Sequence, residues 1–202
     1  MRTTALHQAA PTAFGLAGLL LAGCLGTTPP STFYLLKALP EPEGGAAARD
    51  GVSVEVGPVA LPAYLDRPQL AAAGGDHVLA IDQTHRWAEP LGDGFTRVLS
   101  ENLAILLGTP NVYRHSQRRG APVDFQVEVV VTRFDPDANG RAVLAAVWSV
   151  IGDGGKTVLS RKRSSLSVPA AAASPGAMVA AQNEALHAFS REVAAEIRRL
   201  GR

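Results

Sequence analysis

Alternation of apolar and polar residues marks the clearest strands of this chain. Residues 123–132 place Val or Phe at every second position, mostly between polar residues, which is the pattern of a strand with one buried face. Residues 52–56 alternate in the same way, and we expect Gly57-Pro58 to end that strand. Residues 142–151 are apolar in both alternating sets, which indicates a strand that is central or covered on both faces. Shorter apolar runs predict strands at 33–36 and 77–81.

Two turn signals connect the last strands of the chain. A polar segment from Asp135 to Gly140 precedes residues 142–151, and Gly152-Asp153-Gly154-Gly155 is typical of a hairpin turn before a strand at 157–168. That strand carries Arg161-Lys162-Arg163, and charges of this kind protect the edge of a sheet from unwanted pairing. Contact of the same basic run with anionic lipid headgroups is the alternative interpretation.

Two segments have the periodicity of amphipathic helices. The first begins at Pro90, presents an apolar stripe from Leu91 to Leu106 and stops at Gly108. The second begins with Ser174 as N-cap and Pro175 as first residue. Its inward face comprises Gln182, Leu186, Phe189, Val193, Ile197 and Leu200. With a turn and short helix over 62–70, these elements predict a single α+β domain, in which two main helices pack on a mixed, mostly antiparallel sheet.

The N-terminal segment has the layout of a secretory signal peptide. Arg2 precedes an apolar run over residues 13–21, which is too short to span a bilayer, and small residues follow it. Leu21-Ala22-Gly23-Cys24 resembles the lipobox of bacterial lipoproteins, in which the Cys thiol is acylated and the chain is cut before it. An ordinary secretory signal with a chance Cys is the alternative. The lipobox predicts a signal peptide over 1–23, a lipidated N-terminus and flexible tether over 24–32, and the folded domain over 33–202.

Composition limits the kinds of partner and of stabilisation. Loss of Arg2 with the signal peptide leaves equal numbers of basic and acidic residues, so no overall positive field attracts nucleic acid. Cys24 is the only cysteine, and its acylation leaves no thiol for a disulfide. The 47% hydrophobic content instead allows stabilisation by a packed core and argues against disorder.

Catalytic and metal-binding patterns are weak. The sequence has no Gly-x-Ser-x-Gly elbow for a nucleophilic serine. His77 and His85 flank a strand near Asp82, but their spacing fits no metal motif, and His187 lies beside the apolar face of a helix. Residues 135–140 match the start of a calcium-binding loop, although its twelfth position is Ala146 rather than Glu. We therefore expect no catalytic residue, no metal site and no cofactor, and we expect residues 135–140 to form a polar turn.

Three separated segments together resemble one known family. They are Phe33-Tyr34-Leu35-Leu36; Val54 to Val59 running into Leu61-Pro62-Ala63-Tyr64-Leu65-Asp66-Arg67-Pro68-Gln69-Leu70; and Trp87-Ala88-Glu89-Pro90-Leu91 followed by Phe95, Arg97-Val98-Leu99 and Glu101-Asn102-Leu103. This combination resembles the PqiC (YmbA-like) family of ABC-type transport auxiliary lipoproteins. The resemblance covers most of the chain after the tether and weakens beyond about Tyr113.

The resemblance implies a non-enzymatic role in the cell envelope. Members are outer-membrane lipoproteins associated with MCE-domain (PqiB-like) proteins, which form conduits for lipid between the inner and outer membranes. Leu25 after the lipidated Cys agrees with the outer membrane, because in many proteobacteria an Asp there retains a lipoprotein in the inner membrane. A periplasmic lipid-binding carrier, which holds its substrate in its own cavity, is the alternative function, and an envelope hydrolase ranks third.

The two proline-bounded motifs are the candidate interaction surface. Tyr64, Leu65, Arg67 and Trp87 belong to rigid segments at element ends, and exposed Tyr, Trp and Arg often anchor interfaces. They are predicted to contact the transport partner or a second copy of the chain. In the alternative interpretation, Tyr64 and Trp87 only cover the end of the sheet.

Overall fold

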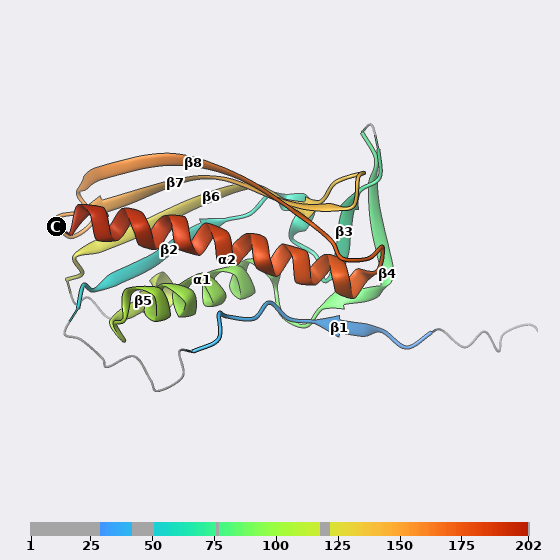
Figure 1. Cartoon of the computed structure of the whole chain (residues 1–202), viewed down its shortest axis with the longest axis horizontal. Coiled ribbons are helices and arrows are strands. Elements are labelled where there is room, and N and C mark those ends of the chain that lie inside the picture. The colour runs from blue at the N-terminus through green and yellow to red at the C-terminus, as the bar shows by residue number, and fades with distance from the viewer. Residues whose placement is uncertain (1–28, 42–50, 76, 118–121, 202) are drawn as a thin grey trace, which may run out of the picture. The chain divides into compact units, whose positions relative to one another are not determined.

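The computed structural model describes residues 29–41, 51–75, 77–117 and 122–201, and its folded unit begins at Ser31. The expected signal peptide, the lipobox and Cys24 lie outside these ranges. Within the folded unit, two helices and two sheets form a single α+β domain, as the sequence pattern predicts (Figure 1).

The larger sheet has five strands in the order β5-β2-β6-β7-β8. Strand β2 (Val54–Ala60) pairs in parallel with β5 (Val112–Arg114) and with β6 (Phe125–Pro136). Strands β6, β7 (Arg141–Gly152) and β8 (Thr157–Pro169) form a long antiparallel meander. The sheet is therefore mixed, and its longest pairings are antiparallel.

A second, three-stranded sheet has the order β1-β4-β3 and lies at one end of the domain (Figure 1). Strand β1 (Thr32–Tyr34) is parallel to β4 (Leu79–Trp87), and β3 (Gln69–Ala73) is antiparallel to it. The sequence predicted one sheet, with β4 ending at Ile81 and no strand at β3. Strand β3 gives no signal because its run of alanines does not alternate in polarity.

Both helices pack on one face of the five-stranded sheet (Figure 1). Helix α1 (Leu91–Leu107) follows Pro90 and ends at Gly108, whose φ of 68° is a left-handed cap. Helix α2 (Pro175–Leu200) is capped by the Ser174 hydroxyl, which accepts a hydrogen bond from the Ala177 N–H. Their apolar faces meet the sheet around four buried aromatic rings, Phe95, Phe134, Trp148 and Phe189, packed edge-on or tilted.

The predicted end of β2 at Gly57-Pro58 is wrong. The strand continues to Ala60, and its register against β6 shifts between Val56 and Val59. Because the irregularity takes Pro58 out of the regular ladder, its missing N–H costs no strand hydrogen bond. Gly57 has a φ of +121°, which a residue with a side chain rarely adopts.

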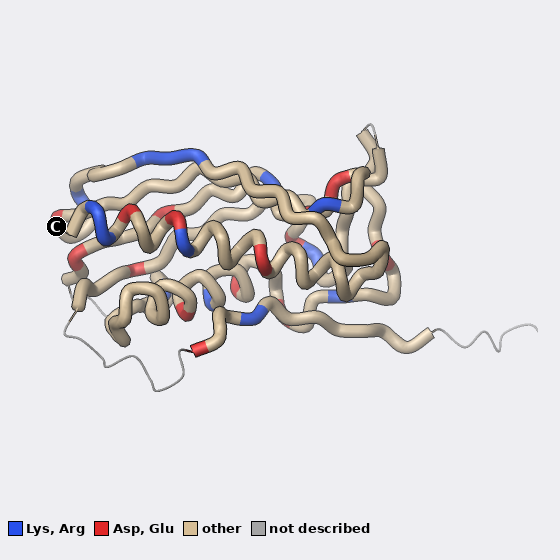
Figure 2. Tube along the Cα trace, viewed as in Figure 1, with Lys and Arg blue, Asp and Glu red and all other residues tan. Residues whose placement is uncertain are grey.

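The positions of the last two strands match their sequence patterns. Strand β7 lies between β6 and β8, with one face buried and the other half-buried. Strand β8 is one of the two edge strands of this sheet, and Figure 2 shows its basic stretch along that edge. Lys162 points toward α2, where its Nζ lies 2.5 Å from Glu196 Oε2. Two further short helices, η1 (Ala63–Leu65) and η2 (His115–Gln117), complete the described elements.

Candidate partner interface

The two proline-bounded motifs of the sequence lie side by side in the structure. The backbone N–H of Trp87 donates a hydrogen bond of 2.6 Å to the carbonyl of Pro68, and Gln69 pairs with Arg86 as β3 begins. Residues 66–68 and 87–90 together line a surface hollow of about 280 Å³. Two segments separated by about twenty residues therefore form one local surface, which we call the motif junction.

The first motif is a tight turn held by its own backbone. Pro62 and Pro68 fix the chain direction at its two ends, and η1 forms between them. The Leu65 N–H donates to the Pro62 carbonyl at 2.9 Å, and the Asp66 N–H to the Ala63 carbonyl at 3.1 Å. This turn directs Leu65 into the core, where 3% of the residue is exposed.

Tyr64 connects this turn to the five-stranded sheet. Its hydroxyl donates a hydrogen bond of 2.9 Å to Asp135 Oδ1, and Asp135 also accepts two hydrogen bonds from Arg133 at 3.2 and 3.1 Å. Burial and then the neighbouring Asp135 carboxylate raise the pKa of Tyr64 to about 12, since both disfavour the phenolate. Tyr64 is thus a neutral donor at physiological pH.

Arg67 offers more free polar surface than the other predicted interface residues. Its Nε donates to the Tyr64 carbonyl at 2.7 Å, and in the described part of the chain its terminal nitrogens make no hydrogen bond. Trp87 is 7% exposed and belongs to the core, as Leu65 does. The burial of Trp87 agrees with a covering role at the sheet end. An interface role stays a prediction, and the side-chain surface available for it belongs to Tyr64 and Arg67, which are partly exposed.

Arg97 connects α1 to the segments that contain Glu89 and Leu36, a role that the sequence interpretation missed. From α1 its Nη2 donates to Glu89 Oε1 at 2.6 Å and to the Leu36 carbonyl at 3.0 Å, and its Nη1 reaches Glu101 at 3.2 Å. The hydrogen bond to Glu89 raises the pKa of Arg97. A Cβ on Gly94 would lie 2.9 Å from Glu89 Oε1, so the glycine makes room for this pair. Arg97 and Glu89 both belong to the motifs that carry the family resemblance, but only their side-chain geometry shows that they form an ion pair.

The histidines make separate contacts. His187 is buried, with Nε2 2.9 Å from the Lys37 carbonyl, while His85 Nδ1 lies 2.8 Å from Asp82 Oδ2. His115 Nδ1 lies 2.5 Å from Glu55 Oε1. Within the described ranges, no group of three or more His, Cys, Asp or Glu side chains could hold a metal ion.

The segment that resembles a calcium loop is the turn between β6 and β7. Asp137 Oδ1 accepts hydrogen bonds of 2.9 Å from the N–H groups of Asn139 and Arg141, so its carboxylate closes the turn on itself. The prediction of a polar turn over 135–140 is confirmed for residues 137–140, whereas Asp135 and Pro136 belong to the end of β6 and Asp135 is buried. No helix in the described ranges is long and apolar enough to cross a membrane.

Comparison with solved structures identifies close matches of fold. An uncharacterised protein matches with a TM-score of 0.68 and 22% identity, covering 84% of this chain and 99% of its own. A protein from Xanthomonas campestris also matches with a TM-score of 0.68, at 17% identity, over 81% of this chain and 93% of its own. At these identities the likeness concerns the fold alone. A search of curated proteins by sequence finds no match.

A family model gives the functional assignment. The model of the ABC-type transport auxiliary lipoprotein component matches residues 34–194, a range that contains all of α1, most of α2, both sheets almost entirely and the motif junction. The resemblance inferred from the three sequence segments is therefore confirmed, and the chain belongs to the family of ABC-type transport auxiliary lipoproteins.

Proposed function

We propose that the protein is an outer-membrane lipoprotein that serves an MCE-type lipid transport system as a non-enzymatic accessory component. It acts by anchoring and by protein–protein contact. The observation that carries this proposal is the family match over residues 34–194, combined with Leu21-Ala22-Gly23-Cys24 ahead of the domain. In this proposal Cys24 carries the lipid, and an MCE-domain (PqiB-like) protein is the partner.

The fold supports anchoring because the tether ends at a fixed point of the domain. Thr32, at the start of β1, pairs in parallel register with His85 of β4. Thr32 is eight positions after Cys24, and an extended chain over eight residue steps reaches at most about 29 Å. A lipid on Cys24 would therefore keep the three-stranded sheet near the membrane surface.

The motif junction is the proposed contact surface. Its backbone is fixed by the bond from Trp87 to Pro68 and by the turn around Tyr64, so its shape exists before a partner binds. Preorganisation of this kind lowers the entropic cost of association. Tyr64 and Arg67 supply accessible groups, and Leu65 and Trp87 support them from beneath. Self-association through the same surface is the alternative use.

Labelling and fractionation test the anchor. Cells grown with a palmitate analogue should label the wild-type protein but not the Cys24→Ser variant, and density separation should place the labelled protein with the outer membrane. An unlabelled wild-type protein would overturn the lipid anchor. Labelled protein in the inner-membrane fraction would overturn the proposed location.

A further inference from the structure

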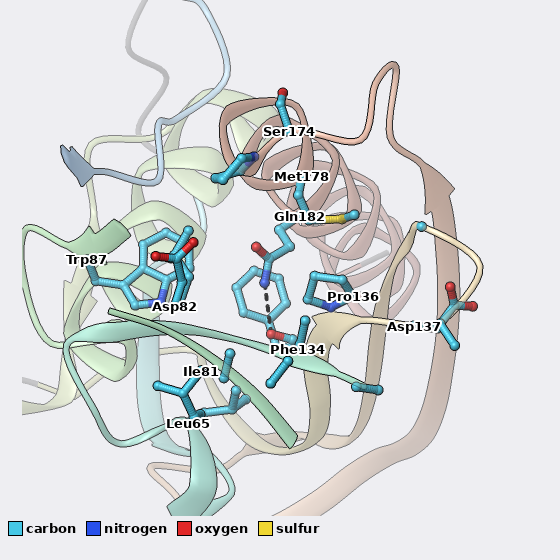
Figure 3. A pocket seen from close by; sticks show the side chains of 18 of the residues that line it. Leu65, Ile81, Asp82, Trp87, Phe134, Pro136, Asp137, Ser174, Met178 and Gln182 are labelled. Atoms are coloured by element: carbon cyan, nitrogen blue, oxygen red, sulfur yellow. Dashed lines mark hydrogen bonds between the residues drawn. The ribbon is translucent and has the colours of Figure 1, made fainter. Parts of the chain in front are cut away.

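An apolar cavity of about 540 Å³ lies where the three-stranded sheet faces the start of α2 and the β6–β7 turn. Figure 3 shows Met178 and Gln182 on the α2 side of the cavity and Ile81 and Leu65 on the opposite side, with Phe134 between them. Trp87 lines this cavity as well as the hollow at the motif junction. Small-molecule sites in proteins have volumes of roughly 300–1,000 Å³, apolar walls and a few polar groups, and this cavity has all three properties.

The charged residues that line the cavity are both acidic. Asp82 and Asp137 are its charged lining residues, and no Lys or Arg of the described residues lines it. Hydrogen bonds from Thr84 and His85 lower the pKa of Asp82 to about 2, so this carboxylate stays ionised. Gln182 is buried and donates to the Phe134 carbonyl at 2.9 Å, while its own carbonyl oxygen accepts no hydrogen bond from the described residues. These groups favour a ligand that carries a cationic donor and disfavour one with a net negative charge.

The cavity is close to the point where the tether enters the domain. Thr32 pairs with His85, three residues from the cavity residue Asp82. Exposed apolar side chains occur on this sheet and beside it: Phe33 of β1 is 62% exposed, Leu35 just after β1 is 50% exposed, and Val78 at the β3–β4 turn is 59% exposed. A membrane anchor with a reach of about 29 Å would hold this end of the domain beside lipid headgroups.

We propose that this cavity binds one acyl chain of a membrane phospholipid whose headgroup carries an amine. The apolar wall takes the chain, the flexible Met178 adapts to it, and the ammonium lies near the Asp82 carboxylate. An extended peptide added to the free edge of β3 fits less well, because that strand has five residues and its register is interrupted after Gln69. The inference that the lipid comes from the adjacent membrane rests on the proposed anchor, whereas the inference that the cavity binds lipid does not.

Native mass spectrometry tests the proposal on the full chain carrying Cys24→Ser, which has no lipid of its own. The protein is incubated with vesicles of equal parts phosphatidylethanolamine and phosphatidylglycerol, separated from them by flotation, and weighed intact. We expect one retained phospholipid per chain, predominantly phosphatidylethanolamine. No retained lipid, or a preference for phosphatidylglycerol, would overturn the proposal.

Two blocking variants and two controls locate the site. Met178→Trp fills the cavity from α2, with Met178→Leu as its volume-conserving control. Ala173→Phe fills it from an exposed loop position, so it tests the site even where Met178→Trp lowers the melting temperature. Val158→Trp adds an aromatic ring at an exposed position that does not line the cavity.

Both blocking variants should reduce the retained lipid at least tenfold, and both controls should retain it. Unchanged retention in both blocking variants would overturn the site. Loss of MCE-protein capture in these variants, with no lipid retained by the wild type, would assign the cavity to a protein partner instead. Because the lipid assay contains no partner protein, its result is independent of the proposed accessory function.

Discussion

The N–H of Trp87 donates a 2.6 Å hydrogen bond to the carbonyl of Pro68, and this bond brings together the two most distinctive motifs of the chain. Their meeting creates the surface hollow lined by Arg67 and Trp87, and Trp87 also lines the apolar cavity. Trp87 therefore contributes to the core and shapes both features at once.

Replacing Trp87 with Ala should strongly destabilise the fold. The residue is 7% exposed, and truncating a buried aromatic side chain typically costs about 3–5 kcal/mol. Urea denaturation followed by circular dichroism measures the loss. An unchanged melting temperature together with lost partner binding would show instead that Trp87 is an interface residue.

Arg97→Met should lower the free energy of unfolding by about 1–2 kcal/mol, because it removes hydrogen bonds that connect α1 to Glu89 and to the Leu36 carbonyl. Arg191→Met on α2 is the matched control, since its 3.6 Å pair with Glu184 is exposed on both sides and should be worth at most a few tenths of a kcal/mol. Equal effects of the two substitutions in thermal denaturation would contradict this role.

Tyr64→Phe should cost about 1–2 kcal/mol, because it removes the hydrogen bond to Asp135 while Arg133 still pairs with that carboxylate. The folded pKa of about 12 exceeds the ordinary value of 10.0, so the contribution is complete below pH 10 and is lost as pH rises through 12. Chemical denaturation at pH 7 measures it. A variant as stable as the wild type would show that this bond adds nothing.

Acid should weaken the contact between β8 and α2. The Glu196 side chain is 2% exposed, and hydrogen bonds from Arg199 and Lys162 hold its pKa well below the ordinary 4.5. Because the folded pKa is the lower one, the stabilisation is present above about pH 4.5 and declines as pH falls below it.

The difference in melting temperature between the wild type and Glu196→Gln isolates this contribution from other acidic groups. It should be largest near neutral pH and should shrink between pH 5 and pH 3. A difference that stays constant over that range would mean that ionisation of Glu196 does not stabilise the fold.

Much of the fold follows from periodicity, and the places where periodicity fails have physical reasons. Strand β6 and both helices are amphipathic, and β7 is a long apolar run between two turn signals, so one-dimensional patterning identifies them. Strand β3 is alanine-rich and has no polar alternation, while β5 has only three residues. Strand β3 of the second sheet and β5 at the edge of the five-stranded sheet therefore depend on tertiary pairing that no local pattern encodes.

The candidate site was also predictable from the sequence only in part. The motifs show that Tyr64, Leu65, Arg67 and Trp87 stand out, but their sequence does not tell which side chains point inward. Burial distinguishes Leu65 and Trp87 from Tyr64 and Arg67. The apolar cavity has no sequence signal, because its walls come from the three-stranded sheet, the β6–β7 turn and α2.

Partner capture is the most direct test of the accessory function. The Cys24→Ser form, used as bait in an envelope extract, should recover an MCE-domain protein identified by mass spectrometry. Arg67→Ala should keep the melting temperature and reduce the recovery at least tenfold, while Arg191→Ala, a surface control on α2, should leave both unchanged. Failure of the wild-type bait to recover any MCE-domain protein, under conditions that preserve such complexes, would contradict the account.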